Sequence, residues 1–221
     1  MNQLYAFLCF LLIMSCTAGD HPVGGDDLDR KVDSVLALMT IEEKVGQLNM
    51  YNGTWTFTGP VPGDDDNQAK AEKIRNGTVG AMLNVLGTDN TRAAQRLAVE
   101  NSRLGIPLIF GYDVVHGYKT MFPAPLGQAA SWDPEVARRS AQIAAREMAS
   151  AGLHWTFAPM IDVAPDGRWG RIMEGAGEDP YLTSVFAAAW TEGYQGSDLA
   201  DLSTVAACAK HFAGYGLVEA G

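Results

Sequence analysis

The stretch IPLIFGYDVVHG, residues 106–117, reads as a strand that ends on polar groups. Its apolar and aromatic residues run up to Tyr112, and Asp113 and His116 follow directly. A short apolar run that is bounded by turn-forming and polar residues is typical of a β-strand. The stretch therefore predicts a strand over residues 107–112 with charged chemistry at its carboxyl end.

Outward from this stretch, strand-like and helix-like segments alternate along the chain. Predicted strands cover 79–85, 107–112, 154–158 and 204–209, and predicted helices cover 91–102, 134–151 and 181–194. Repeated βα order requires parallel strands joined by helical crossovers, in either a (β/α)8 barrel or an open doubly wound sheet. No GxGxxG or GxxxxGK[ST] stretch follows these strands, which weakens the case for a nucleotide-binding open sheet.

Two short helices are expected ahead of the alternating part. Apolar residues recur at helical spacing from Leu28 to Met39, and Thr40 to Glu43 forms a capping-box pattern that opens a second helix through Leu48. Residues 51–68 are rich in turn-forming residues and predict a loop. Three consecutive aspartates at 64–66 are interpreted as part of a solvated loop rather than as a calcium site, because no further ligand spacing is visible.

Polar residues follow three of the predicted strands. Asp113 and His116 come after the strand at 107–112, Asp162 and Arg171 lie on the long connection after 154–158, and Lys210 and His211 come after TVAACA. Barrels of this kind assemble their sites at the carboxyl ends of the strands. A lysine, an arginine, an aspartate and a histidine around one cavity supply both donors and acceptors, as a ligand with many hydroxyl groups requires.

Each of these residues also has a purely structural interpretation. Asp113 can cap the next segment, and His116 is more typical of a structural histidine in such a loop. Arg171 in a Gly-rich loop needs a partner, which is Glu174, a ligand or both. Lys210 and His211 are consecutive, so in a regular strand their side chains would point to opposite faces.

The composition excludes some functions. The chain has 221 residues, 47% hydrophobic content and a formal net charge of −10. It is long enough for a substantial core, and its acidity argues against nucleic acids and anionic membrane surfaces as partners. No cofactor and no metal site is expected.

The amino terminus predicts export. Residues 1–16 contain an apolar stretch from Leu4 to Met14, too short to span a bilayer and suited to a signal-peptide core. Cys16 follows a lipoprotein-like cleavage box, which would anchor the mature chain through a lipid, and ordinary cleavage after Ala18 is the open alternative. Residues 17–27 are expected to be a flexible tether, and residues 28–221 the folded domain.

The combination of GYDVVHG, DGRWGRIMEGAGEDPYL and KHFAGYG resembles the amino-terminal domain of glycoside hydrolase family 3, in particular that of bacterial periplasmic β-glucosidases. The resemblance implies a (β/α)8 barrel of the TIM type and the hydrolysis of terminal β-D-glucosyl residues from glucosides or gluco-oligosaccharides by a retaining mechanism. It also implies that Asp113, Arg171, Lys210 and His211 bind the hydroxyl groups of the non-reducing glucose.

The same resemblance leaves the catalytic residues unassigned. The family pattern places the nucleophile and the acid/base residue beyond Gly221, and only about four to five βα units are visible here. We therefore expect an amino-terminal fragment of a longer exported enzyme, inactive and unstable without its carboxyl-terminal part. The open alternatives are a β-xylosidase or arabinosidase of the same family, a non-catalytic sugar-binding remnant, and a lyase that uses Lys210 as a Schiff-base nucleophile.

Overall fold

The computed structural model describes residues 26–53 and 64–219, and the chain divides into two units between Met39 and Thr40. The described part of the first unit is helix α2 (Asp26–Leu38), which confirms the first expected helix and begins inside the segment expected to be a tether. The signal-peptide prediction for residues 1–16 and most of the tether lie outside the described residues. None of the described helices is long and apolar enough to cross a membrane.

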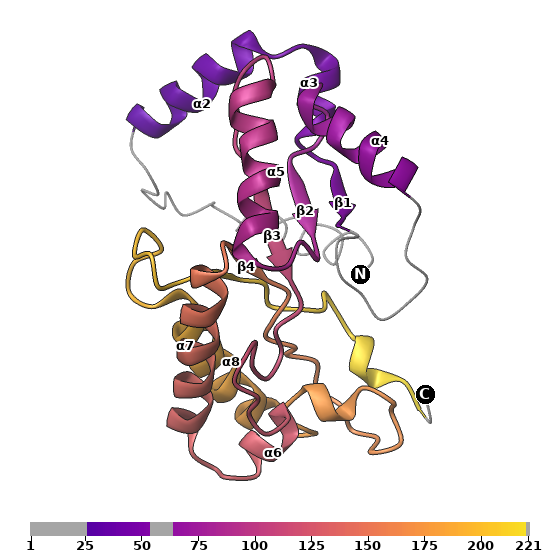
Figure 1. Ribbon diagram of the computed structural model, residues 1–221. Coiled ribbons are helices and arrows are strands. Elements are labelled where there is room, and N and C mark those ends of the chain that lie inside the picture. The colour runs from indigo at the N-terminus through magenta and orange to yellow at the C-terminus, as the bar shows by residue number, and fades with distance from the viewer. Residues whose placement is uncertain (1–25, 54–63, 220–221) are drawn as a thin grey trace, which may run out of the picture. The chain divides into compact units, whose positions relative to one another are not determined.

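Five parallel strands form one sheet in the second unit (Figure 1). They are β1 (Met50–Asn52), β2 (Ala81–Leu83), β3 (Ile109–Tyr112), β4 (Trp155–Thr156) and β5 (Ala206–Ala207). The strands lie side by side in chain order, β1-β2-β3-β4-β5, and every neighbouring pair is parallel. A doubly wound sheet reverses its strand order at a switch point, whereas a barrel adds each strand beside the last. The order therefore confirms the expected class, part of a βα barrel.

Helices connect the strands, and most match the expected ones. Their bounds are α3 (Ile41–Gly46), α4 (Asp64–Arg75), α5 (Thr88–Asn101), α6 (Pro125–Ala129), α7 (Pro134–Ser150) and α8 (Pro180–Gln195), with 3-10 turns η1 (Ile172–Glu174) and η2 (Tyr215–Leu217). The capping box at Thr40 is confirmed, since its side chain accepts from the Glu43 amide and the Glu43 side chain accepts from the Thr40 amide. Proline at the first position and an aspartate cap start both α7 and α8.

The loop expected over residues 51–68 is wrong at both ends. Strand β1 covers Met50–Asn52, and helix α4 begins at Asp64. The helix was missed because it is strongly polar and buries Ile74 as its one large apolar residue, so no periodic pattern marks it. Acidic residues at the start of a segment and basic residues at its end favour a helix, and this pattern was the available signal.

Helices α7 and α8 pack along each other (Figure 1), and α8 also contacts β5. Helix α8 buries Phe186, Trp190 and Tyr194, which recur every four residues, against the alanine-rich face of α7. At Gly193 a Cβ atom would lie 2.4 Å from the carbonyl oxygen of Arg138, so the two helices approach too closely for any side chain there. The tyrosine hydroxyl of Tyr194 donates to the carbonyl of Val114 at 2.7 Å, which fixes the backbone just after β3.

One buried amide joins helices α6, α7 and α8. Gln128 of α6 is 1% exposed, and its oxygen accepts from Ser140 of α7 at 2.9 Å and from the indole of Trp190 of α8 at 3.0 Å. Its nitrogen donates to the carbonyl of Pro123 at 2.8 Å. Because a buried polar group is costly unless it is paired, this amide specifies how α6, α7 and α8 fit together.

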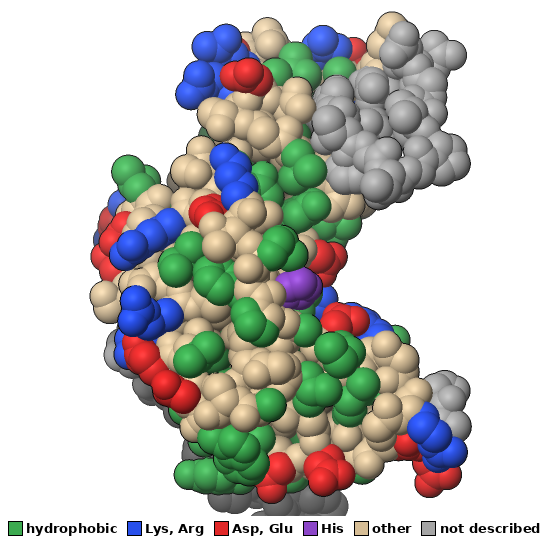
Figure 2. Space-filling view, turned by 60° about the horizontal axis from the view of Figure 1, so that its bottom comes forward, with side chains coloured by type: hydrophobic (Ala, Val, Ile, Leu, Met, Phe, Trp, Pro, Cys, Tyr) green, Lys and Arg blue, Asp and Glu red, His purple; other side chains and the backbone are tan. Residues whose placement is uncertain are grey.

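The surface carries charges of both signs. On the face shown in Figure 2, Lys and Arg side chains form small separate groups among acidic and hydrophobic ones. A nucleic-acid surface instead requires a continuous basic stripe that tracks the phosphates.

Candidate functional site

The four expected binding residues come from the connections that follow three adjacent strands. Asp113 directly follows β3, Arg171 lies on the connection after β4, and Lys210 and His211 lie on the segment after β5. A parallel bridge between Met160 and Lys210 continues the pairing of β4 with β5 and holds these two connections together. The fold therefore brings all four residues to the carboxyl edge of the sheet, as the sequence predicts.

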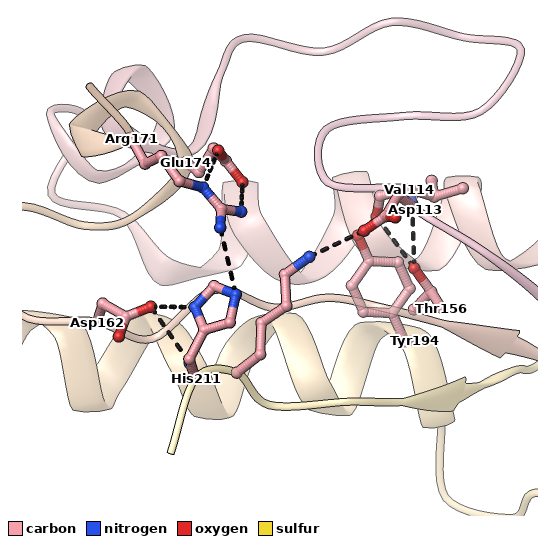
Figure 3. Close-up of polar contacts among 9 residues, drawn as sticks. Asp113, Val114, Thr156, Asp162, Arg171, Glu174, Tyr194 and His211 are labelled. Carbon is pink, nitrogen blue, oxygen red and sulfur yellow. Dashed lines mark hydrogen bonds and ion pairs between the residues drawn. The ribbon is translucent and has the colours of Figure 1, made fainter. Parts of the chain in front are cut away.

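Lys210 and Asp113 form an ion pair across this edge. The lysine Nζ lies 2.8 Å from Oδ1 of Asp113, with side-chain exposures of 15% and 55% (Figure 3). The carboxylate thus has its second oxygen and further lone pairs left for hydrogen bonds, and the ammonium has further donors. The pair joins an acceptor from β3 to a donor from β5.

His211 lies between a carboxylate and a guanidinium group. Its Nδ1 is 2.7 Å from Oδ2 of Asp162, and its Nε2 is 3.3 Å from Nη1 of Arg171 (Figure 3). The backbone amide of His211 donates to the same Asp162 oxygen at 3.2 Å. Asp162 is buried, so the histidine is held by a carboxylate from within the fold.

Glu174 holds Arg171 in a bidentate pair. Nε of Arg171 donates to Oε1 of Glu174 at 2.7 Å, and Nη2 donates to Oε2 at 2.6 Å. These hydrogen bonds lower the pKa of Glu174, aided by the charges of Arg171 and Lys210, and they raise the pKa of Arg171. The structure therefore shows that Glu174 is a partner of Arg171, one of the options left open by the sequence.

Two aromatic side chains and a cavity lie beside Arg171 and His211. The ring of Tyr215 is 4.7 Å from the His211 ring and 5.4 Å from Trp169 between centroids, and the Arg171 guanidinium lies 5.5 Å from the Tyr215 centroid. A cavity of about 320 Å³ is lined by Arg171, His211, Phe212, Ala213, Gly214 and Tyr215. Another cavity, of about 340 Å³, lies between α5 and the end of α7 and shares no lining residue with the first.

Two further residues have structural roles, and the sequence did not assign a role to a third. The Nδ1 of His116 lies 3.0 Å from the Phe122 carbonyl, so this histidine ties down its own loop. Trp155 packs on Phe157 with centroids 4.4 Å apart. Asp162 follows a strand end in the sequence, but the sequence assigned it no role, because nothing in the pattern shows that a carboxylate is buried against a histidine.

The network can bind hydroxyl groups. Lys210 and Arg171 are pure donors, and Asp113 in its ionised form is a pure acceptor. Hydrogen bonds to charged groups contribute roughly 1.5 to 3 kcal/mol each, so a ligand with several hydroxyls gains from each contact. No cluster of three or more metal-ligating side chains occurs in the part of the chain that the structure describes.

The Arg171–Glu174 pair predicts a pH-dependent contribution to stability. Because the pKa of Glu174 is lowered in the folded state, the pair stabilises the fold above the ordinary carboxyl pKa, and this contribution is lost as pH falls through the lowered value. We expect Glu174→Gln to be less stable than the wild type at neutral pH, and the difference to shrink in acid. Urea unfolding of both proteins across this range measures it, and a difference that grows on acidification would contradict the assignment.

Sequence comparison places the chain among known proteins. The profile described as the glycosyl hydrolase family 3 N terminal domain matches residues 40–221, which is the whole of the second compact unit. The chain belongs to this family. The match begins at Thr40, the cap of α3, and covers all five strands and the four candidate residues.

Relatives and solved structures of glycosyl hydrolase family 3 agree with this placement. The periplasmic beta-glucosidase of Salmonella typhimurium is 42% identical and aligns with 92% of this chain and 26% of its own length. A putative beta-xylosidase of Formosa agariphila is 33% identical over 88% of this chain and 27% of its length. The crystal structure of beta-glucosidase from Listeria innocua in complex with glucose superposes with a TM-score of 0.75 at 37% identity, covering 86% of this chain and 27% of that one. The chain thus spans about a quarter of the length of these proteins.

Proposed function

We propose that this family 3 domain holds the non-reducing glucose of β-glucosides or gluco-oligosaccharides for a retaining glycoside hydrolase. Asp113, Arg171, Lys210 and His211 bind the hydroxyl groups of that sugar. The observation that carries the proposal is that the Lys210–Asp113 pair and the Arg171–His211 contact lie at the same edge of the sheet, where Arg171 and His211 line a cavity. The β-glucosidase relatives and the glucose complex of the Listeria protein support the choice of sugar.

The carboxylates of the network suit binding better than catalysis. Retaining hydrolysis needs a nucleophile and an acid/base group about 5 to 5.5 Å apart, and the acid needs a raised pKa. Glu174 has a lowered pKa, Asp113 is paired with Lys210, and Asp162 is paired with His211. We therefore propose that these carboxylates position cations and hydroxyls, and that the two catalytic carboxyl groups lie in a further part of the whole enzyme.

The contacts of the network also bear on the rival functions. Terminal β-xylosyl residues are the second candidate, because a putative beta-xylosidase is among the relatives and the four residues do not exclude a pentose. A Schiff-base lyase is less well supported, since the Lys210 ammonium donates to Asp113 and a nucleophilic amine needs a free lone pair.

Export to the periplasm is part of this proposal. It rests on the apolar segment at residues 4–14 and on the periplasmic beta-glucosidase that is 42% identical. Lipid attachment at Cys16 is a more specific version of the export proposal. Mass spectrometry of the mature chain distinguishes it from cleavage after Ala18.

Calorimetric titration of the 221-residue chain tests the binding proposal. We expect glucose to bind, xylose to bind more weakly because it lacks one hydroxymethyl group, and p-nitrophenyl β-D-glucoside to be left unhydrolysed by this chain. Equal affinity for glucose and for a sugar alcohol without a ring would sink the proposal, since the residues would then not hold a pyranose. Hydrolysis by this chain alone would contradict the binding-only role of its carboxylates.

A further inference from the structure

Both ring nitrogens of His211 face groups whose hydrogen-bonding role is fixed. An ionised carboxylate only accepts and a guanidinium only donates. The nitrogen 2.7 Å from Asp162 must therefore carry the proton, and the nitrogen 3.3 Å from Arg171 must offer its lone pair. These contacts select the neutral tautomer that is protonated on Nδ1, with Nε2 as an acceptor.

Asp162 is placed to hold this arrangement rigidly. Its side chain is 2% exposed, and one of its oxygens accepts both from the ring and from the backbone amide of His211. The segment after His211 packs tightly on the same region, because a Cβ atom at Gly216 would lie 2.4 Å from the carbonyl oxygen of Val163 and 3.1 Å from Cβ of Asp162. Ring and backbone are thus fixed together.

We propose that Asp162 is a positioning residue that fixes the tautomer of His211, so that Nε2 accepts a hydrogen bond from a ligand hydroxyl. The inference rests on the proposed function, because it specifies how His211 of that site contacts the bound sugar. It adds a second hydrogen-bond acceptor to the proposed sugar site. Asp113 accepts hydrogen bonds from hydroxyls on the β3 side, and His211 accepts one on the side that Arg171 and Tyr215 line. In the ligand-free protein an N–H group of Arg171 occupies this lone pair.

The tautomer is measurable without any ligand. In ¹⁵N-labelled chain, long-range nitrogen–proton correlation spectra in mildly alkaline buffer distinguish a protonated, pyrrole-like ring nitrogen from a bare, pyridine-like one. We expect a pyrrole-like Nδ1 and a pyridine-like Nε2 for His211, assigned by the loss of its signals in His211→Gln. His154 is an internal reference for the opposite tautomer, because the Phe110 amide donates to its Nδ1 at 3.1 Å.

Two variants of Asp162 test its part in this choice. Asp162→Ala removes the acceptor, so we expect His211 to populate the Nε2-protonated tautomer. Asp162→Asn is the matched control, because its amide oxygen can accept from the same two N–H groups and should keep the wild-type pattern. A wild-type His211 that is protonated on Nε2, alone or with Nδ1, overturns the proposal even if neither variant folds, and so does an Asp162→Ala spectrum identical to that of the wild type.

A ligand series tests the acceptor role. Each glucose hydroxyl is replaced in turn by hydrogen or by fluorine, which cannot donate a hydrogen bond. We expect one position at which both replacements weaken binding to the wild type about tenfold, and at which this loss disappears in Asp162→Ala. Losses of affinity at the hydroxyl positions that Asp113 contacts should persist in that variant.

The outcomes separate this inference from the proposed function. If fluorine at every position preserves affinity, or if no loss depends on Asp162, then His211 does not accept from the ligand, although glucose binding stands. If no sugar binds at all, the proposed function fails together with the acceptor role, and the ligand-free spectra still decide whether Asp162 fixes the tautomer.

Discussion

Asp113→Asn is expected to weaken glucose binding by roughly 100-fold. The carboxylate is the acceptor that follows β3, and the change replaces a charged acceptor of two hydroxyl contacts by an amide that offers one neutral oxygen. Each charge-assisted bond contributes roughly 1.5 to 3 kcal/mol, and about 1.4 kcal/mol corresponds to a factor of ten. The change also removes the charge opposite Lys210, whose ammonium is 2.8 Å away. Isothermal titration with glucose measures the loss.

Glu100→Gln provides the matched control, because it removes one carboxylate charge from the exposed surface of α5. It should leave glucose affinity unchanged. Glucose affinity in folded Asp113→Asn equal to that of the wild type would show that Asp113 does not contact the sugar.

Gln128→Leu is expected to lower the free energy of unfolding by about 3 to 5 kcal/mol, since each buried polar group left unpaired costs roughly 1 to 3 kcal/mol. The change removes the acceptor of the Trp190 indole and the donor to the Pro123 carbonyl, whereas the Ser140 hydroxyl keeps the Ala137 carbonyl as an acceptor. Leucine has a similar size, so lost hydrogen bonds rather than a cavity dominate. Urea denaturation followed by tryptophan fluorescence measures the change.

Gln142→Leu is the paired control, because Gln142 lies on α7 and is exposed. It should change stability by no more than about 0.5 kcal/mol. Similar losses in both variants would mean that the amide of Gln128 does not specify the packing of α6, α7 and α8.

The fold class was predictable because the pattern of apolar segments is regular over most of the chain. Strand β3 and helices α7 and α8 have strong apolar or capping signals, and they appear where the sequence predicts them. The choice between a barrel and a doubly wound sheet needed the strand order, which depends on contacts between segments distant in the chain. Strand β1 and helix α4 were missed because they are short or polar.

The candidate site could be predicted from the sequence only in part. The sequence placed Asp113, Arg171, Lys210 and His211 at one edge, and the structure brings them there. The expectation that Lys210 and His211 diverge applies to a regular strand, but β5 ends at Ala207 and both residues lie beyond it. Their side chains reach separate partners, Asp113 and Asp162. The pairing with Asp162 was not predictable, because burial and tautomer are properties of the folded neighbourhood.

The central claim is that glucose occupies the cavity beside Arg171 and His211. An NMR titration of the isotope-labelled chain with glucose tests it directly, since shifts map the contact residue by residue. We predict that the signals of Asp113, Arg171, Lys210 and His211 shift together with one dissociation constant. Shifts confined to the cavity between α5 and α7, around Thr91 and His154, would contradict the claim.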